Sequence, residues 1–134
     1  MSEGALFNRV QLDEDVTNVL RNLKARTGLS RNYLCRIGLC YSLREPIPPS
    51  PMEYDANGQE LDRFLLLGED APLYVALTQQ RLIDEDRDPE AEFYEQFVAH
   101  INRGVEQMAG RVSDLSDLYD LIPSIEIEES LQEL

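Results

Sequence analysis

Hydrophobic and polar positions near the start of the chain predict a short strand followed by an amphipathic helix. Between residues 6 and 12 apolar and polar side chains alternate with a period of two, which places Arg9 and Gln11 on the outward side of a strand. Asp13 is the expected N-cap of the helix, and Gly28 ends it. The apolar stripe of this helix, spaced at i, i+3, i+4 and i+7, comprises Val16, Val19, Leu20 and Leu23.

The next segment predicts a second helix, which Ser30 caps and which runs to about Leu43. It is apolar nearly all round, so we expect it to be enclosed by its own domain or shared with another subunit. Gly38 in its interior costs about 1 kcal/mol relative to alanine and is tolerable where helices must approach closely. We therefore expect an interface at this helix and a homo-oligomer.

The remainder of the chain predicts further helices after an irregular connector at residues 45–59, which is rich in proline. Residues 61–67 form a strand or a short helix, and the pattern does not decide between them. Residues 71–83 predict a helix with Pro72 in its first turn.

A long helix follows, with Asp88 as its cap, Pro89 at its first position and Gly110 at its end. Its apolar stripe comprises Phe93, Phe97, Val98, Ile101, Val105 and Met108. A short helix over 113–121 and an acidic tail complete the chain. The expected fold is mainly α: a compact helical single domain over residues 1–111, with residues 112–134 as an acidic C-terminal extension. Its 134 residues suffice for a core without metals or disulfides.

Charge divides the chain unevenly. Residues 1–44 carry seven basic and four acidic side chains, a net of +3, whereas residues 45–134 carry five basic and 22 acidic ones, a net of −17. This asymmetry favours a polyanion as the partner of the first segment. The acidic surface, with Lys24 as its only lysine, is also what we would expect of a protein that works in concentrated salt.

The two cysteines and the N-terminus indicate where the protein works. Cys35 and Cys40 lie about 140° apart around one predicted helix, so they cannot easily bridge each other, and free thiols indicate a reducing compartment. No basic segment followed by an apolar one opens the chain, and the apolar runs are too short to span a bilayer. We expect a cytoplasmic protein with no membrane contact.

Catalytic patterns are missing from the sequence. His100 is the only histidine, so it is the only imidazole that could serve a serine or cysteine nucleophile, and its position favours a packed, hydrogen-bonded helix residue. There is no glycine-rich phosphate loop, and Asp114, Asp117 and Asp120 lack the pattern of a calcium loop. We predict a protein that is not an enzyme and needs neither cofactor nor metal.

Binding is the chemistry that the residues favour. Arginine presents a planar fork that matches phosphate, and the start of the helix after Ser30 adds backbone N–H donors and the positive end of a dipole. Arg21 and Lys24 flank one edge of the first apolar stripe and Arg26 the other. A simpler interpretation is that these cations only border an amphipathic helix and that Arg36 pairs with a nearby acid.

Two segments carry a resemblance to a known family: LRNLKARTGLSRNYLCRIGLCYSL in the first two helices and AHINRGVEQM in the long one. They resemble the DNA sulfur modification protein DndE family over most of residues 8–111. The resemblance implies a small, self-associating helical protein that binds duplex or nicked DNA. It would act beside sulfurtransferase-like and ATPase subunits that replace a backbone oxygen of DNA with sulfur.

On this resemblance the positions carried over are Lys24, Arg26, Asn32 and Arg36, with His100 and Arg103. Combined with the charge pattern, the predicted DNA-binding residues are Arg21, Lys24, Arg26, Arg31, Asn32, Arg36 and Arg103.

Two other interpretations stay open. A strand, a helix, a turn and a second helix also occur in this order in ribbon-helix-helix repressors and antitoxins, where Arg9 and Gln11 would read bases. The overall negative charge favours a third class, an adaptor that binds proteins and not DNA.

Overall fold

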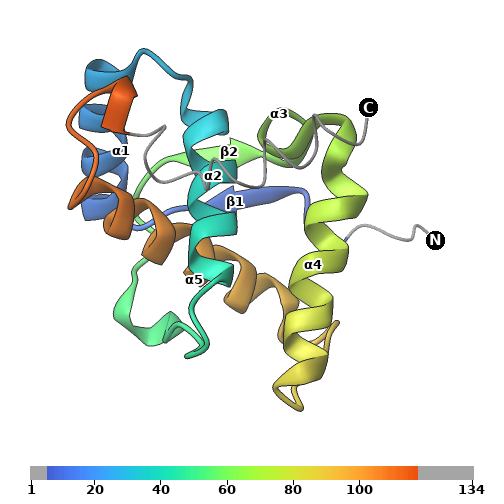
Figure 1. The fold of residues 1–134 in the computed structure, drawn as a ribbon. Coiled ribbons are helices and arrows are strands. Elements are labelled where there is room, and N and C mark those ends of the chain that lie inside the picture. The colour runs from blue at the N-terminus through green and yellow to red at the C-terminus, as the bar shows by residue number, and fades with distance from the viewer. Residues whose placement is uncertain (1–5, 118–134) are drawn as a thin grey trace, which may run out of the picture.

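Two antiparallel strands and a set of helices make up the part of the chain that the computed structural model describes, residues 6–117 (Figure 1). The expected mainly α fold class is confirmed. The strands are β1 (Arg9–Gln11) and β2 (Glu60–Asp62), and the α-helices are α1 (Glu14–Thr27), α2 (Arg31–Leu43), α3 (Arg63–Leu67), α4 (Ala71–Asp84) and α5 (Phe93–Ala109). Two 3-10 turns, η1 (Pro51–Glu53) and η2 (Gly68–Asp70), lie in the connections.

Helix α1 begins and ends where the sequence predicts. The Asp13 carboxylate accepts a hydrogen bond from the backbone N–H of Val16 at 3.1 Å, which satisfies one of the free donors of the first turn. At the other end Gly28 adopts φ 79°, and its N–H donates to the carbonyl of Lys24. This left-handed conformation is accessible to glycine without a Cβ clash.

Residues 61–67, which the pattern left undecided, contain the end of a strand, β2, and a short helix, α3. Strand β2 pairs with β1 so that Val10 lies opposite Leu61, and both side chains are buried. The Asp62 carboxylate then accepts from the N–H groups of Phe64 and Leu65, so the side chain that ends the strand also begins α3.

The pairing of β1 also bears on the ribbon-helix-helix interpretation. One edge of β1 is occupied by β2 of the same chain, and on the other the N–H of Gln11 donates to the hydroxyl of Tyr94 in α5 at 3.2 Å. A ribbon formed with a second subunit would have to displace these contacts. The strand on which the ribbon-helix-helix interpretation depended is therefore already paired within the chain.

Helix α2 lies at the centre of the molecule, between α1 on one side and α4 on the other in Figure 1. It contacts α1, α3 and α5, which explains why its apolar residues are not confined to one stripe. Leu34, Cys35 and Leu39 are buried, while Cys40 is exposed, and both cysteines are free thiols. The chain itself therefore covers much of the apolar surface of α2, while Tyr33 remains 56% exposed, and the homo-oligomer stays a prediction.

The expected close contact at Gly38 is present, but within the chain. A Cβ built on Gly104 of α5 would lie 1.7 Å from the Gly38 carbonyl oxygen, so the backbones of α2 and α5 touch at this point. The interface that Gly38 indicated is the α2–α5 crossing.

Helix α5 starts later than the sequence predicts. The Asp88 carboxylate accepts from the N–H groups of Glu90 and Ala91, as expected of a cap. These bonds form a separate turn before the helix, which begins at Phe93. Glu92 is held by Arg87 at 2.8 Å just before that start. The predicted end at Gly110 is confirmed, and so is the burial of the stripe.

The core gathers along α5. Phe7, Phe93 and Phe97 pack against one another with ring centroids 5.0 to 5.8 Å apart. Val112 is also buried, so packing continues past Gly110. Of the helix predicted over 113–121, a helical turn begins at Leu115, and its remainder lies outside the described residues, as does most of the acidic extension.

Candidate nucleic-acid interface

The predicted DNA-binding residues fall into two groups in the structure. Arg21, Lys24 and Arg26 are exposed on the last turns of α1, and Arg31 is exposed at the start of α2. Arg21 donates to the Asn18 side chain at 2.9 Å and Arg31 to the Gln59 side chain at 3.0 Å. Among residues 6–117 none of these four cations lies in an ion pair with a carboxylate. We call this set the basic face.

The local sequence accounts for this surface. Residues 16–44 contain no aspartate or glutamate, so the last turns of α1 and the whole of α2 bring no acid to it, and the acids of α1, Glu14 and Asp15, lie in its first turn. The apolar stripe of α1 faces the core, which leaves its basic positions in solvent. The hydroxyl of Ser30 caps α2 by accepting from the N–H of Tyr33 at 3.2 Å, so the positive end of that helix lies beside Arg31. Asn32 is half-buried in the same turn.

Arg36 belongs to the second group because its guanidinium is engaged within the fold. Its Nε donates to the carbonyl of Leu66 at 2.5 Å and one terminal nitrogen to that of Leu65 at 3.3 Å. The group also lies 5.2 Å from the ring of Tyr33. Arg36 thus satisfies carbonyls of α3, and within residues 6–117 it forms no ion pair with an acid, in contrast to the simpler interpretation.

Arg103 is engaged more completely. It donates to the Ser42 hydroxyl at 2.9 Å, to the Ser42 carbonyl at 3.0 Å and to the Ile47 carbonyl at 2.6 Å. Arg81 of α4 adds donation to the carbonyl of Leu43 at 2.9 Å. The two guanidinium groups satisfy carbonyls at the end of α2, where the helix dipole favours cations. Burial, and then the positive charge of Arg81, lower the pKa of Arg103.

Sequence reasoning missed the role of Arg81. Its position in a helix gave no local signal, because the carbonyls that it contacts lie 36 and 38 residues earlier in the chain.

His100 is the packed, hydrogen-bonded helix residue that the sequence favoured. It is fully buried, as is Ser42, whose hydroxyl lies 2.8 Å from its Nδ1. Burial lowers the pKa of His100 from 6.5 to about 3, and the charges of Arg103 and Arg81 act in the same direction. A neutral imidazole and a hydroxyl that are both shut off from solvent cannot reach a substrate in this conformation.

The depressed pKa predicts a specific acid sensitivity. Because folded His100 resists protonation until about pH 3 while the unfolded chain takes up the proton near pH 6.5, acid favours unfolding. Between pH 7 and pH 5 this difference corresponds to a loss of about 2 kcal/mol in the free energy of unfolding. Urea unfolding of wild type and His100→Gln at both pH values measures it. The variant should lose less stability over this interval, and equal losses would contradict the assignment.

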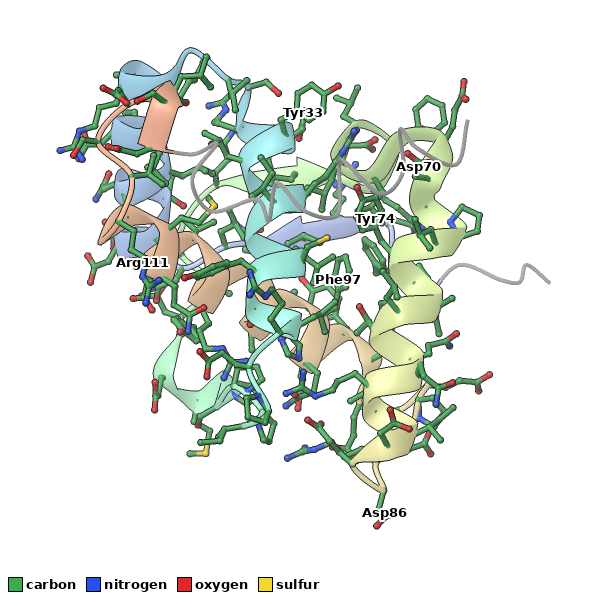
Figure 2. All side chains as sticks on the ribbon, in the orientation of Figure 1. Tyr33, Asp70, Tyr74, Asp86, Phe97 and Arg111 are labelled. Carbon is green, nitrogen blue, oxygen red and sulfur yellow. The ribbon has the colours of Figure 1, made fainter. Side chains whose placement is uncertain are left out.

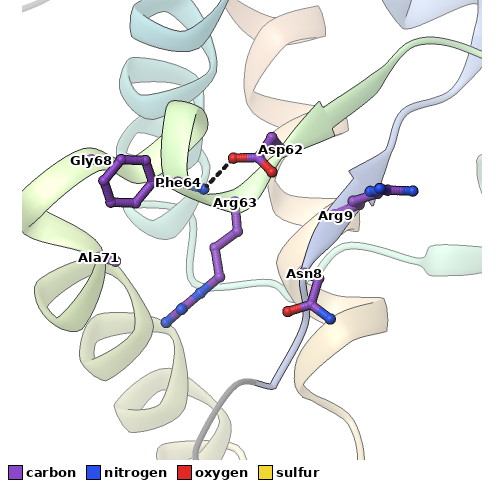
Figure 3. A pocket seen from close by; sticks show the side chains of 7 residues that line it. All are labelled: Asn8, Arg9, Asp62, Arg63, Phe64, Gly68 and Ala71. Carbon is purple, nitrogen blue, oxygen red and sulfur yellow. Dashed lines mark hydrogen bonds between the residues drawn. The ribbon is translucent and has the colours of Figure 1, made fainter.

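One pocket shares no lining residue with the basic face. It has a volume of about 590 Å³ and is drawn in Figure 3 with its lining residues Asn8, Arg9, Asp62, Arg63, Phe64, Gly68 and Ala71. Two of its charged groups already have partners: Asp62 caps α3, and Arg9 pairs with Glu60 at 3.1 Å. The lining contains no serine, cysteine or histidine, so it offers no nucleophile activated by an imidazole.

Within residues 6–117 no three His, Cys, Asp or Glu side chains are placed to hold a metal ion. None of the helices in that range combines the length and the apolar character that crossing a bilayer requires.

The fold and this surface together define a class of small, mainly helical proteins. In this class arginines donate hydrogen bonds to the carbonyls at the end of a central helix, and a neighbouring helix presents cations to solvent. The model of the DNA sulphur modification protein DndE family matches residues 9–115. The chain therefore belongs to the DndE family, as the two sequence segments indicated. The match ends four residues beyond the domain end predicted at 111.

Solved structures agree on the fold. The crystal structure of DndE from Escherichia coli B7A, described as involved in DNA phosphorothioation modification, superposes with a TM-score of 0.62 at 23% identity. A mutant DndE involved in DNA phosphorothioation gives 0.63 at 20% identity. Each comparison covers 78% of this chain and 99% of the other. A comparison with curated protein sequences gave no significant match.

Proposed function

We propose that this chain is a non-catalytic accessory subunit of a DNA phosphorothioation complex that binds the backbone of duplex or nicked DNA through its basic face. One observation carries the proposal. Arg21, Lys24, Arg26 and Arg31 are exposed and lack carboxylate partners among residues 6–117, although the chain has a net charge of −14. By contrast, Arg9, Arg81 and Arg87 all form ion pairs.

Physical chemistry connects such a surface to DNA. Each cation that neutralises a phosphate releases condensed counterions, which favours binding and makes it depend on salt. Contacts of this kind position a protein on the backbone without reading the sequence. The positive end of α2 beside Arg31 adds a site where backbone N–H groups favour an anionic oxygen.

Family membership and the missing catalytic pairs support the accessory role. The two DndE proteins of known structure are described as involved in DNA phosphorothioation, and this chain shares their fold. Cys35 is buried, and burial raises its pKa to about 12, which disfavours the reactive thiolate. Cys40 is exposed as a residue, but desolvation of its thiol group also raises its pKa. Sulfurtransferase-like and ATPase subunits would then supply the chemistry.

A binding titration tests the proposal. We expect the double variant Lys24→Ala/Arg26→Ala to bind a nicked duplex about tenfold more weakly at 0.1 M salt, because two phosphate contacts are lost. The slope of log affinity against log salt should fall by about 1.8, at 0.9 per contact. Fluorescence anisotropy over a salt series gives both quantities.

Arg9→Ala provides the matched control, since Arg9 is exposed but neutralised by Glu60. It should bind nicked duplex nearly as wild type does. Equal binding by wild type and the double variant would remove the basic face from the site, and failure of the wild type to bind DNA at any salt would overturn the function.

A further inference from the structure

Helix α4 exposes an apolar face that the described residues 6–117 leave uncovered. Its exposed residues occupy an arc of about 140° at 100° per residue. They are Pro72, Leu73, Ala76, Leu77, Gln80, Ile83 and Asp84. Leu73 is 56% exposed, Leu77 43% and Ile83 51%, whereas only Thr78 and Leu82 of this helix are buried. A helix that merely closed the core would carry the larger apolar side chains on its inner side.

Exposed hydrophobic side chains are concentrated in this part of the molecule. Of the ten large hydrophobic residues that are exposed among residues 6–117, five lie between 64 and 83, on α4 and on α3 beside it. The segment from Ala71 to Gln80 carries no charge in a chain with 38 charged side chains. Contiguous apolar surface of this kind marks protein-binding sites.

Acidic residues bracket the α4 face. Asp70 and Asp86 lie at opposite ends of the helix in Figure 2, and both are exposed. Glu69 lies beside the first and Asp84 near the second. The one basic residue of α4, Arg81, is turned inward, where it contacts Glu85 and the end of α2. The exposed face is therefore apolar along its length and negative at both ends.

We propose that the α4 face binds an amphipathic helix of another protein that carries an apolar stripe with Lys or Arg at both ends. A second copy of this chain that pairs its own α4 face with this one is disfavoured. Parallel pairing would place Asp70 against Asp70, antiparallel pairing would place Asp70 against Asp86, and either arrangement opposes like charges. A partner helix with Lys or Arg at both ends would instead place opposite charges beside the acidic residues at both ends of α4.

The dimensions of α4 fix the spacing in the partner. Its 14 residues span about 21 Å at 1.5 Å per residue. Cations that meet both acidic ends must therefore stand about 14 residues apart on the partner helix, with apolar residues at i, i+3, i+4 and i+7 between them.

A designed peptide tests this proposal. The probe is an acetylated peptide of about 18 residues with a leucine stripe and lysines in its first and last turns, and the control peptide has glutamates in place of the lysines. By fluorescence anisotropy the lysine-ended peptide should bind the wild-type protein, with at least about tenfold preference over the control. Leu73→Ser/Leu77→Ser should weaken that binding about tenfold.

Matched variants separate the contributions. Met52→Ser changes a side chain that is 95% exposed on η1 and should leave peptide binding unchanged. Asp70→Asn/Asp86→Asn should reduce the preference for lysine ends. It should leave the fold intact, because the Asp70 side chain makes no capping bond and asparagine tolerates the positive φ of Asp86.

Two results would overturn the proposal: equal affinity for both peptides, or an oligomer of the wild type that Leu73→Ser/Leu77→Ser converts to a monomer in sedimentation. The second would make another copy of the chain the occupant. Neither depends on the basic face, so nicked DNA binding by all α4 variants should match that of the wild type.

Discussion

Replacing Gly104 by alanine is expected to destabilise the fold by about 3 kcal/mol, which is at the upper end for overpacking of a core. The added Cβ would lie 1.7 Å from the carbonyl oxygen of Gly38 and 2.3 Å from its carbonyl carbon. Both atoms belong to the backbone of α2, so no side chain can move aside, and the two helices must separate. The gain in helix propensity from alanine, about 1 kcal/mol, does not offset this cost.

Urea unfolding of Gly104→Ala beside Gly110→Ala measures the effect. Gly110 is exposed with φ −76°, and a Cβ there would meet only the Gln107 carbonyl at 3.8 Å, so this variant should unfold as the wild type does or slightly later. If both variants were equally stable, α2 and α5 would not cross in close contact at Gly104.

Replacing Arg103 by alanine is the second large effect, with an expected loss of about 2 to 4 kcal/mol in the free energy of unfolding. The guanidinium donates three hydrogen bonds, and hydrogen bonds from charged groups are among the stronger ones. Its removal leaves the buried Ser42 hydroxyl with only His100 and frees two carbonyls at the end of α2. Unpaired polar groups in a low-dielectric site carry a desolvation cost.

Arg103→Lys distinguishes a structural role from contact with DNA. Lysine keeps the positive charge but lacks the planar fork, so it cannot reach all three acceptors. The structural role predicts that Arg103→Lys loses much of the stability that Arg103→Ala loses, while both bind nicked DNA normally under conditions where they are folded. Wild-type stability in either variant, with DNA binding lost only in the alanine variant, would restore Arg103 as a direct DNA contact.

The predicted DNA-binding residues differ in how far the sequence alone determines their surroundings. Lys24 and Arg26 project from the polar side of an amphipathic helix, so their exposure follows from the sequence period alone. Arg36 and Arg103 have the same chemistry and also lie on helices, yet their guanidinium groups satisfy backbone carbonyls. The acceptors lie 30 residues away for Arg36 and 61 residues away for Arg103. No local pattern can reveal such a partner.

The same distinction holds for the elements. Asp13, Gly28 and Ser30 set the ends of α1 and α2 through bonds to residues three or four positions away, and the sequence predicted all three. The start of α5 could not be predicted in this way. Asp88 makes the bonds of a cap, but Glu92 is fixed by Arg87 and the helix begins after it.

By itself the sequence determined the mainly helical fold, the caps, the buried stripes and a basic segment within an acidic chain, because each depends on neighbours within about one helical turn. Tertiary structure alone decided that Asp62 both ends β2 and begins α3, that α2 and α5 touch at two glycines, and that α4 leaves an apolar face in solvent. Among residues 6–117 it also decided which arginines satisfy backbone carbonyls and which remain exposed without a carboxylate partner. Those outcomes depend on which distant segments pack together, and hydrophobic burial selects the packing without marking it at any single position.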